Sequence, residues 1–307
     1  MAEALEKLVP GDIVDLPVGK QRYALFTNES GGIMDDLMVA NYGDHLYVVV
    51  NAACKEQDIA HMRAGLGEGV QLEVLDDRAL IALQGPEAAE VLARLCAEVS
   101  DMVFMDSRQL TIDGVDCLVS RSGYTGEDGY EISIPAADAP RIAGLLLEQD
   151  EVELIGLGAR DSLRLESGLC LYGHDLDTET TPIESSLIWA ISKSRRADGE
   201  RAGGFPGADR IFDQMANKNY DRKRVGLLGQ SKAPVREGSE LVNASGEKIG
   251  VVTSGTYGPT IGGPVAMGYV QPAYATLDTE VFALVRGKQL PMVVSKMPFI
   301  EQRYYRG

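Results

Sequence analysis

The chain has 307 residues, 45% of them hydrophobic and 24% charged, which is enough to bury the cores of two or three domains. Its formal net charge is −17 and its pI is near 4.6. Proteins bind DNA and RNA through basic surfaces, so the sequence argues against a nucleic-acid ligand. No apolar run approaches the length of roughly 18 residues that a membrane-spanning helix needs, and no signal-peptide pattern is present.

Four cysteines, Cys54, Cys96, Cys117 and Cys170, lie far apart and show no CxxC spacing. We expect buried free thiols, which are typical of a reducing compartment such as the bacterial cytoplasm. The three histidines are too scattered to form a metal-binding pair on a helix, so no metal site is predicted.

The first half of the chain alternates short strands with helices. Helices are predicted at Glu56–Leu66, after Pro86 and near Ala139–Gln149. Strands are predicted at Tyr23–Phe26, Leu37–Ala40, Leu46–Val50, Gln71–Leu75, Ala79–Leu83, Cys117–Ser120 and Tyr130–Ile134. This mixture favours antiparallel α+β layers, and no complete glycine motif for a nucleotide is present.

A glycine-rich turn at Arg121–Gly129 leads directly into an alternating strand. Tyr130, Ile132 and Ile134 should share one face of that strand, and Glu131 should lie on the other. Glu131 is therefore a candidate ligand-binding carboxylate at the edge of a glycine loop, although an ordinary hairpin with a solvated glutamate fits the same pattern.

The second half begins with a predicted helix over Gly156–Leu169. A flexible stretch follows at Ala197–Gly207, which contains four glycines and a proline. Beyond about Asn217, short apolar strands separated by glycine turns predict a small β-barrel or a jelly-roll-like domain. These strands are expected at Gly246–Gly255, Val265–Val270, Glu280–Val285 and Met292–Val294.

Several separated motifs occur together and in order. They are Gly31–Leu37, Gly123–Ile134, Gly156–Asp177, Thr180–Trp189 and Ser295–Phe299. Together they resemble the aminomethyltransferase family, the T-proteins of the glycine cleavage system, over nearly the whole chain. The resemblance implies a multi-domain cloverleaf of antiparallel α/β (ferredoxin-like) layers that form a folate-binding domain, followed by a small C-terminal β-barrel.

The resemblance also implies a reaction. Family members take the aminomethyl group carried on lipoylated H-protein, release ammonia and deliver the one-carbon unit to tetrahydrofolate, which becomes 5,10-methylenetetrahydrofolate. The implied partners are tetrahydrofolate and lipoylated H-protein, without a metal or a nucleotide, and we expect a monomer.

The family motif assigns the catalytic role to Asp36. Asp35 and Asp36 are adjacent, and successive side chains of a strand face opposite ways, so both cannot enter one pocket. Asp36 is expected to orient the attacking folate nitrogen and to stabilise developing positive charge. The sequence does not decide whether it also removes a proton.

Seven further residues match folate-contacting positions of the family: Glu131, Arg160, Tyr304, Tyr124, Trp189, Tyr47 and Val49. Glu131 and Arg160 match the pterin-binding pair, and Tyr124 and Trp189 would supply flat walls. Two alternatives compete with these assignments. Arg160 could belong to a surface network with Asp161 and Arg164, and a lone tryptophan is normally a core residue.

The resemblance implies three domains. The second α+β domain would consist of residues 1–70 and 100–152. A discontinuous folate-binding domain would consist of residues 71–99 and 153–215, and the barrel would consist of residues 216–307. The family's usual N-terminal portion is missing, so we expect an apolar patch near the helix over Leu157–Leu169. Two alternative functions stay open: a folate-binding relative such as a demethylase or an RNA-modification helper, and a truncated product without activity.

Overall fold

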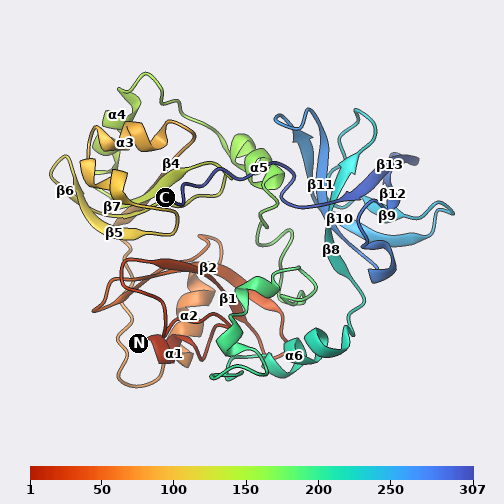
Figure 1. Cartoon of the computed structure of the whole chain (residues 1–307), viewed down its shortest axis with the longest axis horizontal. Helices are drawn as coiled ribbons and strands as arrows, with labels where there is room; N and C mark the ends of the chain where they lie inside the picture. The colour runs from red at the N-terminus through yellow and green to blue at the C-terminus, as the bar shows by residue number, and fades with distance from the viewer.

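The computed structural model describes residues 1–307, which form three units arranged around a centre (Figure 1). The first unit is built on an antiparallel sheet in the order β1–β2–β3. Its strands are β1 (Gln21–Thr27), β2 (Ile33–Asn41) and β3 (Leu46–Val49). Two helices cover one face of this sheet, α1 (Ala2–Leu5) and α2 (Lys55–Gly65).

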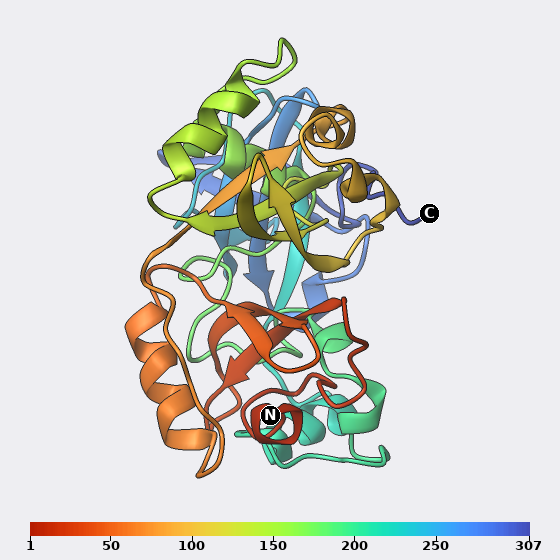
Figure 2. The ribbon, with the colours of Figure 1, turned by 90° about the vertical axis from the view of Figure 1, so that its left-hand side faces the viewer.

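Alternation along β2 sorts its side chains between two environments. Leu37 and Val39 pack with Met62 of α2 in the helix-covered core. Asp36 and Met38 alternate with them and therefore lie on the opposite face. Figure 2 shows this sheet between α2 and the second unit.

The chain returns to the first unit after residue 170. Leu25 and Ile33 of the sheet pack against Cys170, Leu176 and Leu187. The segment then forms two short 3-10 helices and one α-helix, namely η2 (Ile188–Ala190), η3 (Lys193–Arg195) and α6 (Ala208–Asn217).

The second unit is a four-stranded antiparallel sheet in the order β4–β7–β6–β5. Its strands are β4 (Arg78–Gln84), β5 (Ser107–Ile112), β6 (Val115–Ser120) and β7 (Gly129–Pro135). Its helices are α3 (Ala88–Ala93), η1 (Ala97–Asp101) and α4 (Ala139–Leu147). Tyr130, Ile132 and Ile134 are fully buried in its core, so their predicted shared face is confirmed.

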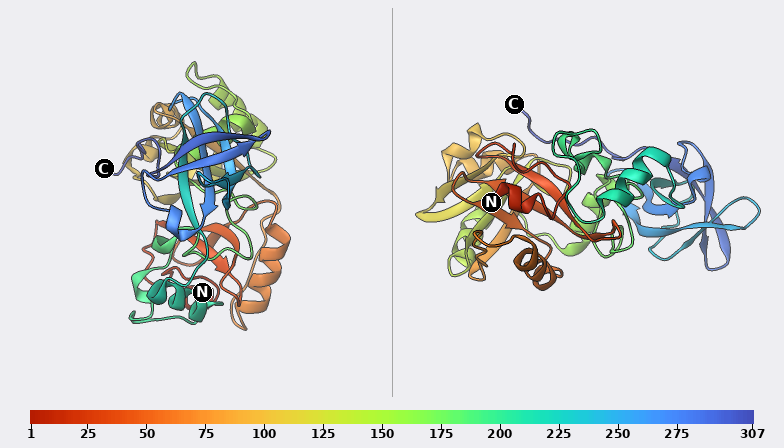
Figure 3. Two further views of the ribbon diagram at one scale, coloured as in Figure 1. Left: turned by 90° about the vertical axis from the view of Figure 1, so that its right-hand side faces the viewer. Right: turned by 90° about the horizontal axis from the view of Figure 1, so that it is seen from below.

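The third unit is a closed six-stranded barrel, which confirms the predicted C-terminal barrel and the α+β class (Figures 1 and 3). Around the barrel the strands follow the order β10–β11–β8–β13–β12–β9. They are β8 (Lys223–Gly229), β9 (Glu240–Val242), β10 (Lys248–Gly258), β11 (Gly263–Val270), β12 (Glu280–Val285) and β13 (Lys288–Ser295), with η4 (Pro272–Tyr274) between β11 and β12.

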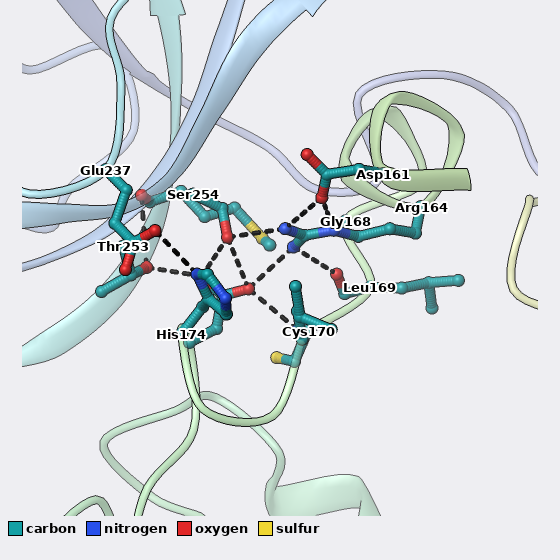
Figure 4. A network of polar contacts seen from close by, with 12 residues as sticks. Asp161, Arg164, Gly168, Leu169, Cys170, His174, Glu237, Thr253 and Ser254 are labelled. Atoms are coloured by element: carbon teal, nitrogen blue, oxygen red, sulfur yellow. Dashed lines mark hydrogen bonds and ion pairs between the residues drawn. The ribbon is translucent and has the colours of Figure 1, made fainter. Parts of the chain in front are cut away.

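Helix α5 (Leu157–Glu166) lies between the second unit and the barrel (Figure 1). Leu165 packs against Val265 and Met267 of β11. The fully buried Arg164 donates hydrogen bonds of 2.8 Å to Asp175 and to Ser254 of β10 (Figure 4). The hydrogen bond to Ser254 joins α5 directly to the barrel.

Strand pairing corrects the expected domain boundaries. The predicted split between 71–99 and 100–152 is not observed, because β4 pairs with β7 along its whole length and the two segments share one core. Residues 1–70 instead pack with the segment after residue 170, through Leu25 and Ile33 and through the hydrogen bond from Thr27 to the carbonyl of Pro206. The strand predicted at Gln71–Leu75 is wrong, since this stretch has no pairing partner and serves as a linker from α2 to β4.

The last residues leave the barrel and return to the second unit (Figure 3). The backbone N–H of Arg303 donates a 2.8 Å hydrogen bond to the carbonyl of Gly126, and that of Phe104 donates 2.7 Å to Tyr305. The expected barrel segment 216–307 therefore ends near Ser295, and the tail belongs structurally with the glycine-rich turn.

Two further expectations can be compared with the structure. All four cysteines are free and buried, as predicted. The apolar patch expected near α5 is present, since Leu154, Ile155 and Leu157 are 83%, 67% and 83% exposed. None of the helices has the length and apolarity that crossing a membrane requires.

Candidate active site

Asp36 lies on β2, on the sheet face opposite the one that α1 and α2 cover. Its Oδ2 accepts a 2.9 Å hydrogen bond from the hydroxyl of Tyr23, and its Oδ1 accepts a 2.7 Å bond from Nδ2 of Asn51. Asp35 is fully buried on the opposite face, as the alternation predicted. Two neutral donors therefore fix both oxygens of Asp36 without an ion pair.

Its surroundings raise the pKa of Asp36 to about 6. Burial is the largest cause, because it penalises the charged carboxylate, and the nearby Asp35 adds to it. The hydrogen bonds from Tyr23 and Asn51 act in the other direction. A carboxyl with such a pKa is ionised at neutral pH yet close to taking up a proton, which suits a group that handles protons in a reaction.

Trp189 in η2 stacks obliquely on Tyr23, with ring centroids 5.1 Å apart. It is 59% exposed, so the alternative of a core tryptophan does not hold. An open groove of about 460 Å³ runs beside the two rings, and Lys193 and Ser194 also line it. The groove therefore connects the surface with the hydrogen-bond partner of Asp36.

Tyr47, Val49 and Glu131 line one cavity between the first and second units. Val49 pairs with Met38, which also lines the cavity and lies two residues from Asp36 on the same sheet face. Ser122 donates a 2.7 Å hydrogen bond to Oε2 of Glu131. The enclosed volume is only about 20 Å³, about one water molecule, so a larger ligand requires the lining side chains to move apart.

Tyr124 and Arg160 form a second aromatic element of the site. The guanidinium of Arg160 lies 4.6 Å from the centre of the Tyr124 ring, and the Tyr124 hydroxyl donates to the carbonyl of Cys170. The alternative surface network is instead a buried one built on Arg164, which Arg160 does not join. Arg160 is exposed and its hydrogen-bonding edge is available to a ligand.

Tyr304 lies in the returning C-terminal tail. Its ring stacks on Phe104 with centroids 4.1 Å apart and planes inclined by 13°. Burial raises the pKa of its hydroxyl, and the charges of Glu127 and Glu131 act in the same direction. The tail thus brings a residue from the end of the chain to the second unit's glycine-rich turn.

Sequence reasoning missed Tyr23, Asn51 and Ser122, which bind the two predicted carboxylates. Their residue types do not indicate a functional role in the sequence. Tyrosine is common within strands, and asparagine is common directly after them. Only the pairing of β1 with β2 brings Tyr23 beside Asp36, and only the end of β3 brings Asn51 there.

The comparisons with known proteins agree with this geometry. Residues 1–195 match the family described as GCVT N-terminal domain, and residues 222–301 match the glycine cleavage T-protein C-terminal barrel domain. The chain is 49% identical to the mitochondrial aminomethyltransferase of Homo sapiens over 98% of its own length and 75% of that protein. With the mitochondrial aminomethyltransferase of Dictyostelium discoideum it shares 44% identity over 97% of its length and 77% of that protein.

A solved structure shows the same fold. The crystal structure of glycine cleavage system aminomethyltransferase T from Bartonella henselae superposes with a TM-score of 0.91 at 42% identity, covering 99% of this chain and 82% of that one. Two family matches, relatives above 40% identity and a shared three-unit architecture lead to one assignment. The chain belongs to the aminomethyltransferase family, the T-proteins of the glycine cleavage system, and is an enzyme of that family.

Proposed function

We propose a mechanism for this aminomethyltransferase. In it, the one-carbon unit of an aminomethyl group is delivered to tetrahydrofolate, ammonia is released and 5,10-methylenetetrahydrofolate is formed. The observation that carries the proposal is Asp36, a carboxyl held by Tyr23 and Asn51. Tyr23 lines the open groove, and Met38, two residues from Asp36 along β2, lines the interdomain cavity. The relatives named aminomethyltransferase support the reaction type.

The residues around the cavity fit a flat heteroaromatic ligand. A pterin presents an edge of amide and amine groups, and the carboxylate of Glu131 is suited to accept from it. Met38, Tyr47 and Val49 offer apolar and aromatic surface to the ring. Arg160 and Tyr124 provide a cation and an aromatic face for the more polar part of the ligand. Tyr304 is assigned to the same folate site, at the end of the returning tail.

Asp36 acts at the reacting atoms. In the ionised form it accepts the N–H of the attacking folate nitrogen, orients that nitrogen and stabilises positive charge that develops on the transferred carbon. Its raised pKa also lets it hold the proton that the nitrogen loses. Tyr23 and Asn51 keep the carboxylate aimed throughout.

Lipoylated H-protein is proposed as the donor. The groove beside Trp189 and Tyr23 is open to the surface and reaches the hydrogen-bond partner of Asp36, so a flexible arm could enter there. We further propose that the chain is a monomer that docks transiently on H-protein. The bacterial cytoplasm is the proposed location, supported by four free cysteines, although curated relatives are named mitochondrial.

A reconstituted assay tests the proposal. Purified chain, aminomethylated H-protein and tetrahydrofolate should release ammonia and form methylenetetrahydrofolate in equal amounts, and omission of either substrate should abolish both. Folate binding without ammonia release would overturn the proposal and favour the demethylase or RNA-modification alternatives. Absence of both would favour an inactive product.

A further inference from the structure

Two serines lie beside the carboxyl of Glu131, at the wall of the interdomain cavity. Ser120 ends β6 and pairs directly with Glu131 of β7, and both residues line the cavity. Ser122 follows two residues later, in the glycine-rich turn. Ser120 is 9% exposed and Ser122 is 5% exposed, so water has little access to either hydroxyl. Their hydrogen atoms therefore go to groups of the protein.

The three side chains are joined by hydrogen bonds that run in one direction. A carboxylate has only acceptor oxygens, so Ser122 donates its single hydroxyl hydrogen to Oε2 of Glu131, at 2.7 Å. The hydroxyls of Ser120 and Ser122 bond to each other at 2.9 Å. Because the hydrogen of Ser122 is already committed, Ser120 is the donor in this second bond. We call this chain of hydrogen bonds, from Ser120 through Ser122 to Glu131, the serine relay.

The backbone of the turn holds Ser122 in place. Nε2 of Gln84 donates to the carbonyl of Ser122 at 2.9 Å and to that of Tyr130 at 3.2 Å. Thr125 in turn donates from its hydroxyl to Oε1 of Gln84 at 3.1 Å. Residue 123 is a glycine because a Cβ there would lie 1.7 Å from Oε1 of Gln84. The glycine-rich turn thus provides a fixed point from which Ser122 reaches Glu131.

Glu131 needs such a fixed point. A glutamate has several rotatable side-chain bonds, so an unanchored carboxyl at the cavity wall would sample several positions. Within the chain only Oε2 of Glu131 is engaged in a hydrogen bond, and Oε1 is left for a ligand. The relay therefore holds the carboxyl from one side. It also commits the hydrogen of Ser120 away from the cavity, so that Ser120 and Glu131 together face the cavity with acceptors.

We propose that Ser122 is a positioning residue for Glu131 and that Ser120 sets the direction of its hydroxyl. The relay makes this part of the cavity wall a surface of hydrogen-bond acceptors, which selects a ligand edge with adjacent N–H donors. A heterocycle with an amino group beside a ring N–H fits the wall, whereas a carbonyl in place of that amino group is repelled. The role rests on the proposed function, in which Glu131 accepts from tetrahydrofolate.

A double-mutant cycle, with the Kd of tetrahydrofolate measured by calorimetry, separates positioning from packing. Ser122→Ala removes the donor to Glu131, and the Kd should rise about tenfold because the free protein no longer holds the carboxyl ready for the ligand. Glu131→Ala should raise the Kd as well. In the Glu131→Ala background, Ser122→Ala should change the Kd by less than about twofold, since no carboxyl remains to be held. A further tenfold rise in that background would overturn the proposal.

Ser133→Ala is the matched control for the cycle. Ser133 lies two residues from Glu131 and lines the same cavity, but its hydroxyl accepts from Nε of Arg78 at 2.9 Å and is not part of the relay. Whatever its own effect on the Kd, that effect should add to the effect of Glu131→Ala within about twofold. If Ser122→Ala does not fold, Ser122→Cys replaces it, because a thiol has nearly the same shape and is only a weak donor. The same loss that disappears in the Glu131→Ala background is then expected.

The ligand side tests the acceptor wall. For the wild type, a tetrahydrofolate analogue with an oxygen in place of the 2-amino group should bind at least about tenfold more weakly than tetrahydrofolate. Equal affinities would overturn the proposal. If Glu131→Ala left the Kd of tetrahydrofolate unchanged, the proposed folate site would fall and the positioning role with it. If Glu131→Ala weakened binding and a folded Ser122→Ala did not, only the positioning role would fall.

Discussion

The hydroxyl of Tyr23 donates a 2.9 Å hydrogen bond to Oδ2 of Asp36 while the ring of the same tyrosine stacks on Trp189. One residue of β1 thus joins the proposed catalytic carboxyl to the aromatic wall of the groove. Because this bond favours the ionised carboxylate, it limits how far burial can raise the pKa of Asp36.

Tyr23→Phe removes that hydrogen bond and keeps the ring. The pKa of Asp36 should rise above its present value of about 6, and a hydrogen bond to a charged group, roughly 1.5–3 kcal/mol, corresponds to about one to two pH units. The acid limb of the kcat profile should therefore move to higher pH. An unmoved limb would show that Asp36 does not control turnover.

Asp36→Asn retains the shape of the side chain and removes its charge. We expect tetrahydrofolate binding within several fold of the wild type and a loss of turnover on the order of 10²–10⁴, typical of a lost acid or base group. Steady-state kinetics with aminomethylated H-protein measure it. If the variant kept most of its activity, Asp36 would have to be reassigned to a structural role.

The sequence predicted much of the secondary structure and the barrel, because alternating and glycine-punctuated patterns are local. It did not predict which segments share a sheet. The linker at Gln71–Leu75 alternates like a strand, but it lacks a partner, and partners are chosen by tertiary packing. The pairing of β4 with β7 sets the domain boundary. Neither the residue spacing nor the composition of these two segments indicates that they pair.

The residues of the candidate site also fall into two groups, those that the sequence alone indicates and those that only the folded chain shows. Asp36 and Glu131 could be proposed from the sequence because they lie within family motifs. Tyr23 and Asn51 could not, because each comes into contact with Asp36 only through the folding of other strands beside it.

Trp189 is the only tryptophan, so its fluorescence reports on the groove. A reduced folate bound beside Asp36 should quench it saturably, because the Trp189 ring stacks on Tyr23, whose hydroxyl bonds Asp36. Glu131→Ala and Arg160→Ala should each weaken the titration by roughly 1–3 kcal/mol, because their ligand partners lose a hydrogen bond. Arg160→Lys is the matched control, since it keeps the charge but not the planar group that stacks on Tyr124. Unchanged titrations for both alanine variants would place the pterin elsewhere.

The ion pair between Arg164 and Asp175 should matter for stability. Both side chains are almost completely buried, and Arg164 also bonds Ser254 of the barrel (Figure 4). Arg164→Met leaves Asp175 without its cation and should lower the free energy of unfolding by about 3–5 kcal/mol. Lys248→Met, at a pair with Glu240 in which both side chains are exposed, is the control and should cost about 1 kcal/mol or less. Denaturant unfolding at neutral pH measures both, and equal losses would contradict the prediction.

The raised pKa of Asp36 also predicts how stability depends on pH. The native carboxyl has a pKa of about 6 and the unfolded one about 3.8, so the native state binds the proton more tightly. Asp36 therefore lowers the free energy of unfolding progressively as the pH rises from about 4 through 6, and the penalty is fully present at pH 7.5. One pKa unit corresponds to 1.36 kcal/mol, which limits the penalty to about 3 kcal/mol.

Asp36→Asn cannot ionise and should be the more stable protein at pH 7.5, with the difference shrinking toward pH 4. Thermal melts across this range measure it, and a constant offset between the two proteins would show that the carboxyl does not titrate in the native state as its burial requires.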